Sequence, residues 1–197
     1  MNSFLKKEAV IYGAGHILTR LVTFLLLPLF TNIFTRAEYG VISLIYIVIG
    51  FFTVVLHLGL DASLLKYYKN RDFVERKRYV TNTYLPLLII NIGFFVLCFL
   101  LKDYLAVYLL GINDSFMFIM VVLILFFDVL WAMPMVMLRI DNKPFQFIAS
   151  NLTNVLSNIF FIYLFVIVYD MGVWGVVLSG LVASGLLFVI TLFPIIQ

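Results

Sequence analysis

Two ionisable side chains share one face of the first long apolar stretch of this chain. His16 and Arg20 are four residues apart, and Arg20 lies about eleven residues inside the stretch, near the middle of a membrane at roughly 1.5 Å per residue. Arginine is always charged, and its planar fork suits phosphate oxygens. We therefore expect Arg20 to bind an anionic ligand or to pair with a carboxylate on a neighbouring helix. His16 would contact the ligand, carry a proton or hydrogen-bond across helices.

Acidic residues at membrane depth are the candidates for ion coupling. Asp128 lies between Leu-Phe-Phe and Val-Leu-Trp. Ionisable groups at this depth cost about 2.5–3.5 kcal/mol on insertion scales, so they commonly mark function. Asp128 would couple transport to an ion through its own protonation, form an ion pair with Arg20, or only lock the helices as part of a fixed buried pair. His57 and Asp61 are spaced one helical turn apart and could pair, but Asp61 is close to a basic loop, which favours an interfacial charge.

An asparagine stripe marks the fifth apolar stretch. Asn151, Asn154 and Asn158 follow a spacing of three and then four residues, which places them on one face of a helix. Asparagine amides bind sugar hydroxyls or hydrogen-bond neighbouring helices. The continuity of the stripe favours a wet cavity. In the sixth stretch, glycines and serines form a small-residue face that is typical of close helix packing.

These residues are carried by stretches long enough to cross a bilayer. The chain has 197 residues, of which 64% are hydrophobic and 12% charged, and a mean hydropathy of +1.15. About 20 apolar residues span the hydrocarbon core as a helix, and lipid requires backbone polar groups to be paired within the segment. The sequence therefore predicts an all-α membrane protein, with one six-helix transmembrane bundle over 1–197. The predicted helices are 9–33, 39–64, 80–101, 116–138, 147–169 and 173–196.

The basic residues alternate between connecting segments, which indicates an orientation. With a cytoplasmic N-terminus, the outer loops carry Arg36 and Lys102, whereas the inner segments carry ten basic residues. Those ten are Lys6, Lys7, Lys66, Lys69, Arg71, Arg76, Lys77, Arg78, Arg139 and Lys143. The positive-inside rule then predicts that both termini are cytoplasmic. The basic segments would set this topology and contact anionic head groups of membrane lipids, so we expect no nucleic-acid partner.

Other chemistry has little support in the sequence. Cys98 is the single cysteine, so no intrachain disulfide framework exists. There is no glycine-rich phosphate loop, paired-cysteine zinc site or acidic pair in a soluble loop, and we expect no metal or cofactor. An enzyme would have to work inside the bilayer without a recognisable nucleophile and base. We therefore expect that the chain is not an enzyme.

Three stretches resemble a known transporter superfamily. The first contains YG at 12–13, Arg20, PLF at 28–30 and EYG at 38–40; the second is GLDASLLKYY at 59–68; the third joins LRIDNKP at 138–144 to the asparagine-rich stretch and to GVWG at 172–175. Their order and spacing are similar to those of oligosaccharide and polysaccharide flippases, the O-antigen transporter-like members of the multidrug/oligosaccharidyl-lipid/polysaccharide exporter superfamily.

The resemblance implies a multi-pass transporter of the inner (cytoplasmic) membrane that serves polysaccharide biosynthesis. It would move an oligosaccharide linked to a polyprenyl diphosphate across the membrane by alternating access. Arg20 matches the cationic residues that line the cavity of related flippases. Members have twelve or fourteen helices in two lobes, and this chain matches the N-terminal lobe. We expect it to be a fragment of a longer chain or to pair with a second lobe on another subunit.

Two alternatives remain open from the sequence. A cation-coupled multidrug exporter of the same superfamily would use Asp128 and the 21 phenylalanines, although Arg20 argues against a cationic drug. A membrane assembly partner that does not transport would use the glycine face and basic loops as binding surfaces, with Arg20 and Asp128 paired inside the monomer.

Overall fold

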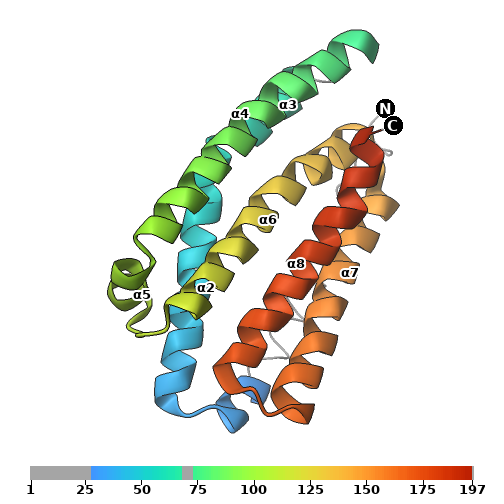
Figure 1. Cartoon of the computed structure of the whole chain (residues 1–197). Coiled ribbons are helices and arrows are strands. Elements are labelled where there is room, and N and C mark those ends of the chain that lie inside the picture. Colours follow the sequence, from blue (N-terminus) through green and yellow to red (C-terminus); the bar gives the residue numbers. More distant parts are fainter. Residues whose placement is uncertain (1–27, 68–72, 197) are drawn as a thin grey trace.

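The computed structural model describes residues 28–67 and 73–196, which form helices joined by short turns and contain no strand (Figure 1). The backbone is helical over 28–33 and then forms α2 (Arg36–His57), α3 (Leu60–Tyr67), α4 (Phe73–Leu100), α5 (Lys102–Leu110), α6 (Ser115–Ile140), α7 (Pro144–Ile162), the π-helix η1 (Tyr163–Val168) and α8 (Gly172–Ile196).

Five of the described helical segments are long and apolar enough to cross a membrane. They are Arg36–His57, Arg78–Leu100, Ser115–Ile140, Pro144–Val168 and Gly172–Thr191. Large apolar side chains also cover the outside of the bundle: Ile47, Phe51 and Val54 on one face of α2 are 64%, 62% and 76% exposed. Such a surface suits lipid rather than water. The prediction of an all-α membrane protein is confirmed. Most of the predicted first helix, 9–33, lies outside the described residues.

Helix α6 is the centre of the described bundle. It packs most extensively against α8 and also contacts α4 and α2, while α7 packs mainly against α8 (Figure 1). Phe118, Leu130 and Met133 of α6 are almost completely buried, as is Leu187 of α8. Because α6 is surrounded by protein, a polar side chain on it faces neighbouring helices rather than lipid.

The second predicted helix, 39–64, is interrupted. Leu58 and Gly59 both have positive φ angles, 51° and 69°, and they separate α2 from α3. Left-handed backbone ends an α-helix, and glycine adopts it without steric cost. His57 and Asp61 therefore lie on separate helices, rather than one turn apart on one helix as the sequence predicted.

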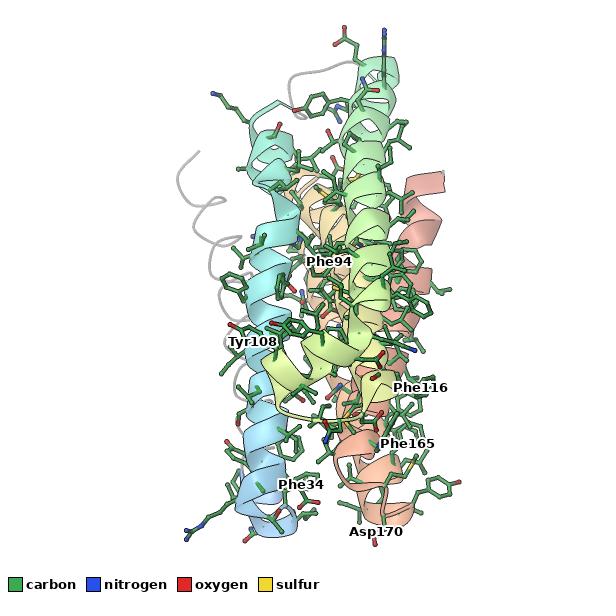
Figure 2. All side chains as sticks on the ribbon, turned by 60° about the vertical axis from the view of Figure 1, so that its left-hand side comes forward. Phe34, Phe94, Tyr108, Phe116, Phe165 and Asp170 are labelled. Carbon is green, nitrogen blue, oxygen red and sulfur yellow. The ribbon has the colours of Figure 1, made fainter. Side chains whose placement is uncertain are left out.

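A short helix that the sequence analysis did not predict follows α4. Helix α5 runs across the direction of the long helices (Figure 2). Tyr104 and Tyr108 on it are 67% and 73% exposed, and their rings stack with centroids 5.8 Å apart. Exposed tyrosines are enriched at membrane interfaces, so α5 has the composition of a helix that lies in the membrane surface.

Several residues that carry the resemblance to flippases lie at helix starts and in the turns between helices. In a capping box at the start of α2, the Thr35 N–H donates to Glu38 Oε2 at 2.9 Å and the Glu38 N–H donates to Thr35 Oγ1 at 3.4 Å. Between α6 and α7, Asn142 has a φ of 55° and Pro144 begins the next helix. These motif positions therefore have a structural reason for their residue types.

The π-helix η1 and helix α8 approach very closely through Gly175. A Cβ atom built on Gly175 would lie 2.9 Å from Val166 Cγ2 and 3.0 Å from the backbone carbonyl atoms of Phe165 in η1. Only glycine allows this approach without a shift of the backbone. The small-residue face predicted on the sixth apolar stretch thus packs closely against its neighbour at this position.

Candidate functional site

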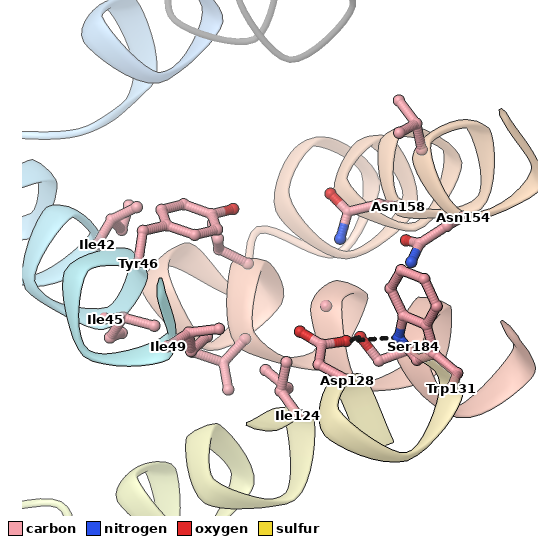
Figure 3. A pocket seen from close by; sticks show the side chains of 14 residues that line it. Ile42, Ile45, Tyr46, Ile49, Ile124, Asp128, Trp131, Asn154, Asn158 and Ser184 are labelled. Atoms are coloured by element: carbon pink, nitrogen blue, oxygen red, sulfur yellow. Dashed lines mark hydrogen bonds between the residues drawn. The ribbon is translucent and has the colours of Figure 1, made fainter. Parts of the chain in front are cut away.

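A cavity of about 240 Å³ lies between α2, α6, α7 and α8 (Figure 3). Its polar side chains are Tyr46 from α2, Asp128 and Trp131 from α6, Asn154 and Asn158 from α7, and Ser184 from α8. The rest of its lining is apolar: Ile42, Ile45, Ile49, Ile124, Val155, Val176, Val177 and Gly180. The cavity therefore gathers polar groups from four helices inside an apolar bundle, at a depth where isolated polar groups are costly.

The carboxylate of Asp128 is held by two hydrogen bonds to one of its oxygens. Trp131 Nε1 donates to Asp128 Oδ1 at 2.9 Å, and Ser184 Oγ donates to the same oxygen at 2.7 Å. No described residue donates to Oδ2, which points into the cavity on the side away from these donors (Figure 3). The carboxylate is thus oriented by the protein, and among the described residues its Oδ2 has no hydrogen-bond donor.

Two of the three asparagines in the predicted stripe line this cavity. The amide groups of Asn154 and Asn158 extend from α7 toward the side of the cavity that holds Asp128 (Figure 3). Neither amide hydrogen-bonds a described residue. Asn151 differs, because its Nδ2 donates to the carbonyl of Phe147 on its own helix at 2.9 Å and the residue does not line the cavity.

The other predicted site residues are not part of this cavity as described. His57 hydrogen-bonds through Nδ1 to the carbonyl of Thr53 at 2.5 Å, which fixes it against its own helix. Asp61 belongs to α3, but its side chain lies outside the described residues, as do His16 and Arg20. The predicted pairing of Arg20 with Asp128 therefore stays a prediction.

Three cavity residues were missed as site residues by sequence reasoning. Ser184 was assigned to a packing face, but its hydroxyl hydrogen-bonds across helices to Asp128. Trp131 follows Asp128 by three residues, a spacing that places both on one helix face and could have indicated their contact. Tyr46 gives no comparable signal, because tyrosine is common at many positions of membrane helices.

Asn91 is another intramembrane polar residue that the sequence analysis did not single out. It is almost fully buried in α4, and its Nδ2 donates to the carbonyl of Phe126 in α6 at 3.0 Å. Its amide is thus used to join two helices. This arrangement is structural, in contrast to the amides of Asn154 and Asn158, for which the described part of the chain offers no hydrogen-bond partner.

A second cavity, of about 230 Å³, has a wholly apolar lining from α2, α4, α5 and α6. Cys98 lies in it beside Phe94, Leu97 and Leu105, with no polar side chain in the lining. The described residues also contain no cluster of three or more His, Cys, Asp or Glu that could hold a metal ion. The Asp128 cavity is therefore the better candidate for binding a polar ligand.

Comparison with known proteins gives the family. Neither the curated proteins nor the solved structures yielded a significant match. The family model described as polysaccharide biosynthesis protein matches residues 5–195, nearly the whole chain. Together with its apolar spans, this match identifies a multi-pass membrane protein, and the chain belongs to the polysaccharide biosynthesis protein family.

Proposed function

We propose that this chain is the N-terminal lobe of an O-antigen transporter-like flippase, which moves a polyprenyl-diphosphate-linked oligosaccharide across the cytoplasmic membrane. The observation that carries the proposal is a polar cavity between membrane-spanning helices of a polysaccharide biosynthesis protein. Polysaccharide precursors are hydrophilic and need a polar path through lipid. A cavity lined by Asp128, Asn154 and Asn158 supplies hydrogen-bonding groups within such a path.

The proposed mechanism divides the substrate among different surfaces. Arg20, with His16 one turn away, would neutralise part of the diphosphate, and the polyprenyl tail would stay in the bilayer. The cavity amides would meet polar groups of the glycan. Asp128 would respond to a coupling ion, because no described residue donates to its Oδ2. No covalent step is required, so the chain would act as a transporter rather than an enzyme.

Alternating access requires a partner for this bundle. We propose six spans with both termini in the cytoplasm, as the distribution of basic residues favours. A second lobe, in the same longer chain or in another subunit, would face the first, and rocking of the two would open the substrate path to each side in turn.

A multidrug exporter is the second candidate, and the composition of the cavity favours it in one respect. A carboxylate with one oxygen that no described residue donates to, beside the rings of Trp131 and Tyr46, suits an organic cation. The two functions predict different phenotypes, because a drug exporter would protect cells from ethidium and leave surface glycan unchanged.

The proposal is tested by genetic complementation with the full-length gene. Cells that lack the gene should lose surface polysaccharide and accumulate the lipid-linked precursor inside. The wild-type gene should restore export, whereas Arg20→Ala and Asp128→Asn should restore it poorly at equal membrane abundance. Thr153→Ala is a matched control, because this half-buried α7 residue donates to the carbonyl of Ala149 on its own helix and does not line the cavity.

Two outcomes would contradict this proposal. Normal surface glycan in the deletion strain, together with increased ethidium sensitivity, would favour drug export. Full glycan export by the Arg20→Ala variant would remove the proposed diphosphate contact.

A further inference from the structure

We infer that the Asp128 cavity is a subsite for one uncharged pyranose ring of the glycan. This inference rests on the proposed function, because it assumes that the chain meets a sugar-bearing substrate. It goes further by stating which part of the substrate enters the cavity and which sugars the cavity rejects.

The polar groups of the cavity call for a ligand that both donates and accepts hydrogen bonds. Asp128 Oδ2 is an acceptor without a described donor, whereas Asn154 and Asn158 each have an amide with donors and an acceptor to offer. A hydroxyl group placed between them donates to the carboxylate and accepts from an amide. Neighbouring hydroxyls on a sugar ring provide this pairing repeatedly.

The orientation of the asparagines favours a hydroxyl over a metal cation. Asn158 Nδ2 lies 3.9 Å from the position that a Cβ on Gly180 would take, so this amide nitrogen faces α8 and the cavity (Figure 3). The indole N–H of Trp131 also points at Asp128. Hard cations such as Ca²⁺ and Mg²⁺ need a shell of oxygen ligands, and each N–H group that faces the cavity leaves one position fewer for such a ligand.

The size of the cavity suits a single ring. Its volume of about 240 Å³ is below the roughly 300–1,000 Å³ that is typical of pockets for drug-sized ligands. A pyranose ring matches this scale, whereas a whole oligosaccharide would have to extend outside the cavity.

The apolar part of the lining suits the carbon skeleton of a sugar. Trp131 contributes an aromatic surface, and Ile45, Ile49 and Ile124 contribute aliphatic ones. A pyranose has hydroxyls on its rim and C–H groups on its faces, so it uses both kinds of surface. A uronic acid would bring its own carboxylate into a cavity whose described lining contains no Lys, Arg or His, and burying a charge without a partner is costly. We therefore expect the subsite to reject acidic sugars.

The tryptophans of the chain allow a direct test. There are two, Trp131 in the cavity and Trp174, which stacks on Phe116 with ring centroids 5.7 Å apart. The experiment uses the full-length protein in detergent with Trp174→Phe and with any tryptophan beyond these 197 residues also replaced by phenylalanine. The fluorescence then comes from Trp131 and reports on the cavity. Titration with methyl glucoside, methyl galactoside and N-acetylglucosamine should change its fluorescence saturably, with a millimolar Kd for at least one of them. Glucuronate at the same concentrations should cause no saturable change.

Variants assign the response to the cavity. In the Trp174→Phe background, Asn158→Ala and Asn154→Ala should each raise the Kd by roughly three- to tenfold, which is the loss of one or two ordinary hydrogen bonds. Thr153→Ala should leave the Kd unchanged. Gel filtration and circular dichroism establish that each variant is folded, and two asparagine variants are used so that misfolding of one leaves the test intact.

Three results would overturn the inference. They are the absence of a saturable response to all three neutral sugars, an equal response to glucuronate, or a response to Na⁺ with none to sugars, which would make the cavity a cation site. The complementation experiment separates this failure from that of the proposed function. Glycan export that depends on Arg20, in a protein whose cavity ignores sugars, would refute the subsite and keep the flippase.

Discussion

The hydrogen bond between Ser184 and Asp128 joins α8 to α6, and its strength can be estimated from its setting. Ser184 Oγ donates over 2.7 Å to a carboxylate, and hydrogen bonds to charged groups in soluble proteins contribute about 1.5–3 kcal/mol. Between membrane helices, double-mutant cycles average about 0.6 kcal/mol with a maximum near 1.7. Because Trp131 donates to the same oxygen and can partly replace the lost bond, we expect a coupling free energy of about 0.6–1.7 kcal/mol, the membrane range.

The assay is a double-mutant cycle on the free energy of unfolding. Ser184→Ala, Asp128→Ala and the double variant of the full-length protein are unfolded reversibly with SDS in mixed micelles. Ser179→Ala serves as the matched control: Ser179 is fully buried on the same helix, but its hydroxyl donates to the carbonyl of Val176 at 2.7 Å. The Ser179 and Asp128 substitutions should therefore be additive.

A coupling between Ser184 and Asp128 that is smaller than about 0.3 kcal/mol, the usual limit of additivity, would refute the reasoning. So would an equal coupling for Ser179, because the effect would then come from general loosening of α8 rather than from the interhelical hydrogen bond.

Further predictions concern packing, a buried amide and the asparagine stripe. Gly175→Ala should cost about 1–3 kcal/mol because its Cβ would lie within 3.0 Å of atoms in η1, whereas Gly93→Ala meets nothing within 4 Å and should stabilise by about 0.5–1 kcal/mol; SDS unfolding measures both signs. Asn91→Ala should lower the free energy of unfolding by about 1 kcal/mol, since a buried interhelical hydrogen bond is lost, and unchanged stability would contradict that role. Asn158→Ala should reduce glycan export severalfold, and more than Asn151→Ala does, when surface polysaccharide is compared at equal abundance; equal losses would count against the cavity.

The long helices were predictable because lipid restricts them strongly. A span needs about 20 apolar residues with every backbone group paired, and this requirement is visible in composition alone. Breaks within an apolar stretch, and short helices, are harder to recognise from composition. Leu58 and Gly59 lie in apolar sequence that reads as continuous helix, and the nine residues of α5 are too short to register as a span.

The candidate site was predictable as separate residues rather than as a constellation. Asp128, Asn154 and Asn158 stand out because polar groups at membrane depth need partners. Their meeting in one cavity depends on which helices are neighbours, and hydropathy carries no such information. The hydrogen bond from Ser184 to Asp128 could not be predicted for the same reason, since the two residues are 56 positions apart in the sequence.

The length of α4 indicates how the bundle is placed in the bilayer, and therefore how deep the Asp128 cavity lies. Its 28 residues extend about 42 Å at 1.5 Å per residue, roughly 12 Å more than the hydrocarbon core of a bilayer. The excess matches its first turns, which contain Glu75, Arg76 and Arg78 and project beyond the other helices (Figure 1). With those turns in water, Asp128, near the middle of the 26 residues of α6, lies about 15 Å from either surface of the core. A group bound there is halfway across the membrane and equally remote from both aqueous phases. For the proposed flippase, the cavity would therefore be a midpoint of passage rather than an entrance, and its occupancy would commit a substrate to neither side.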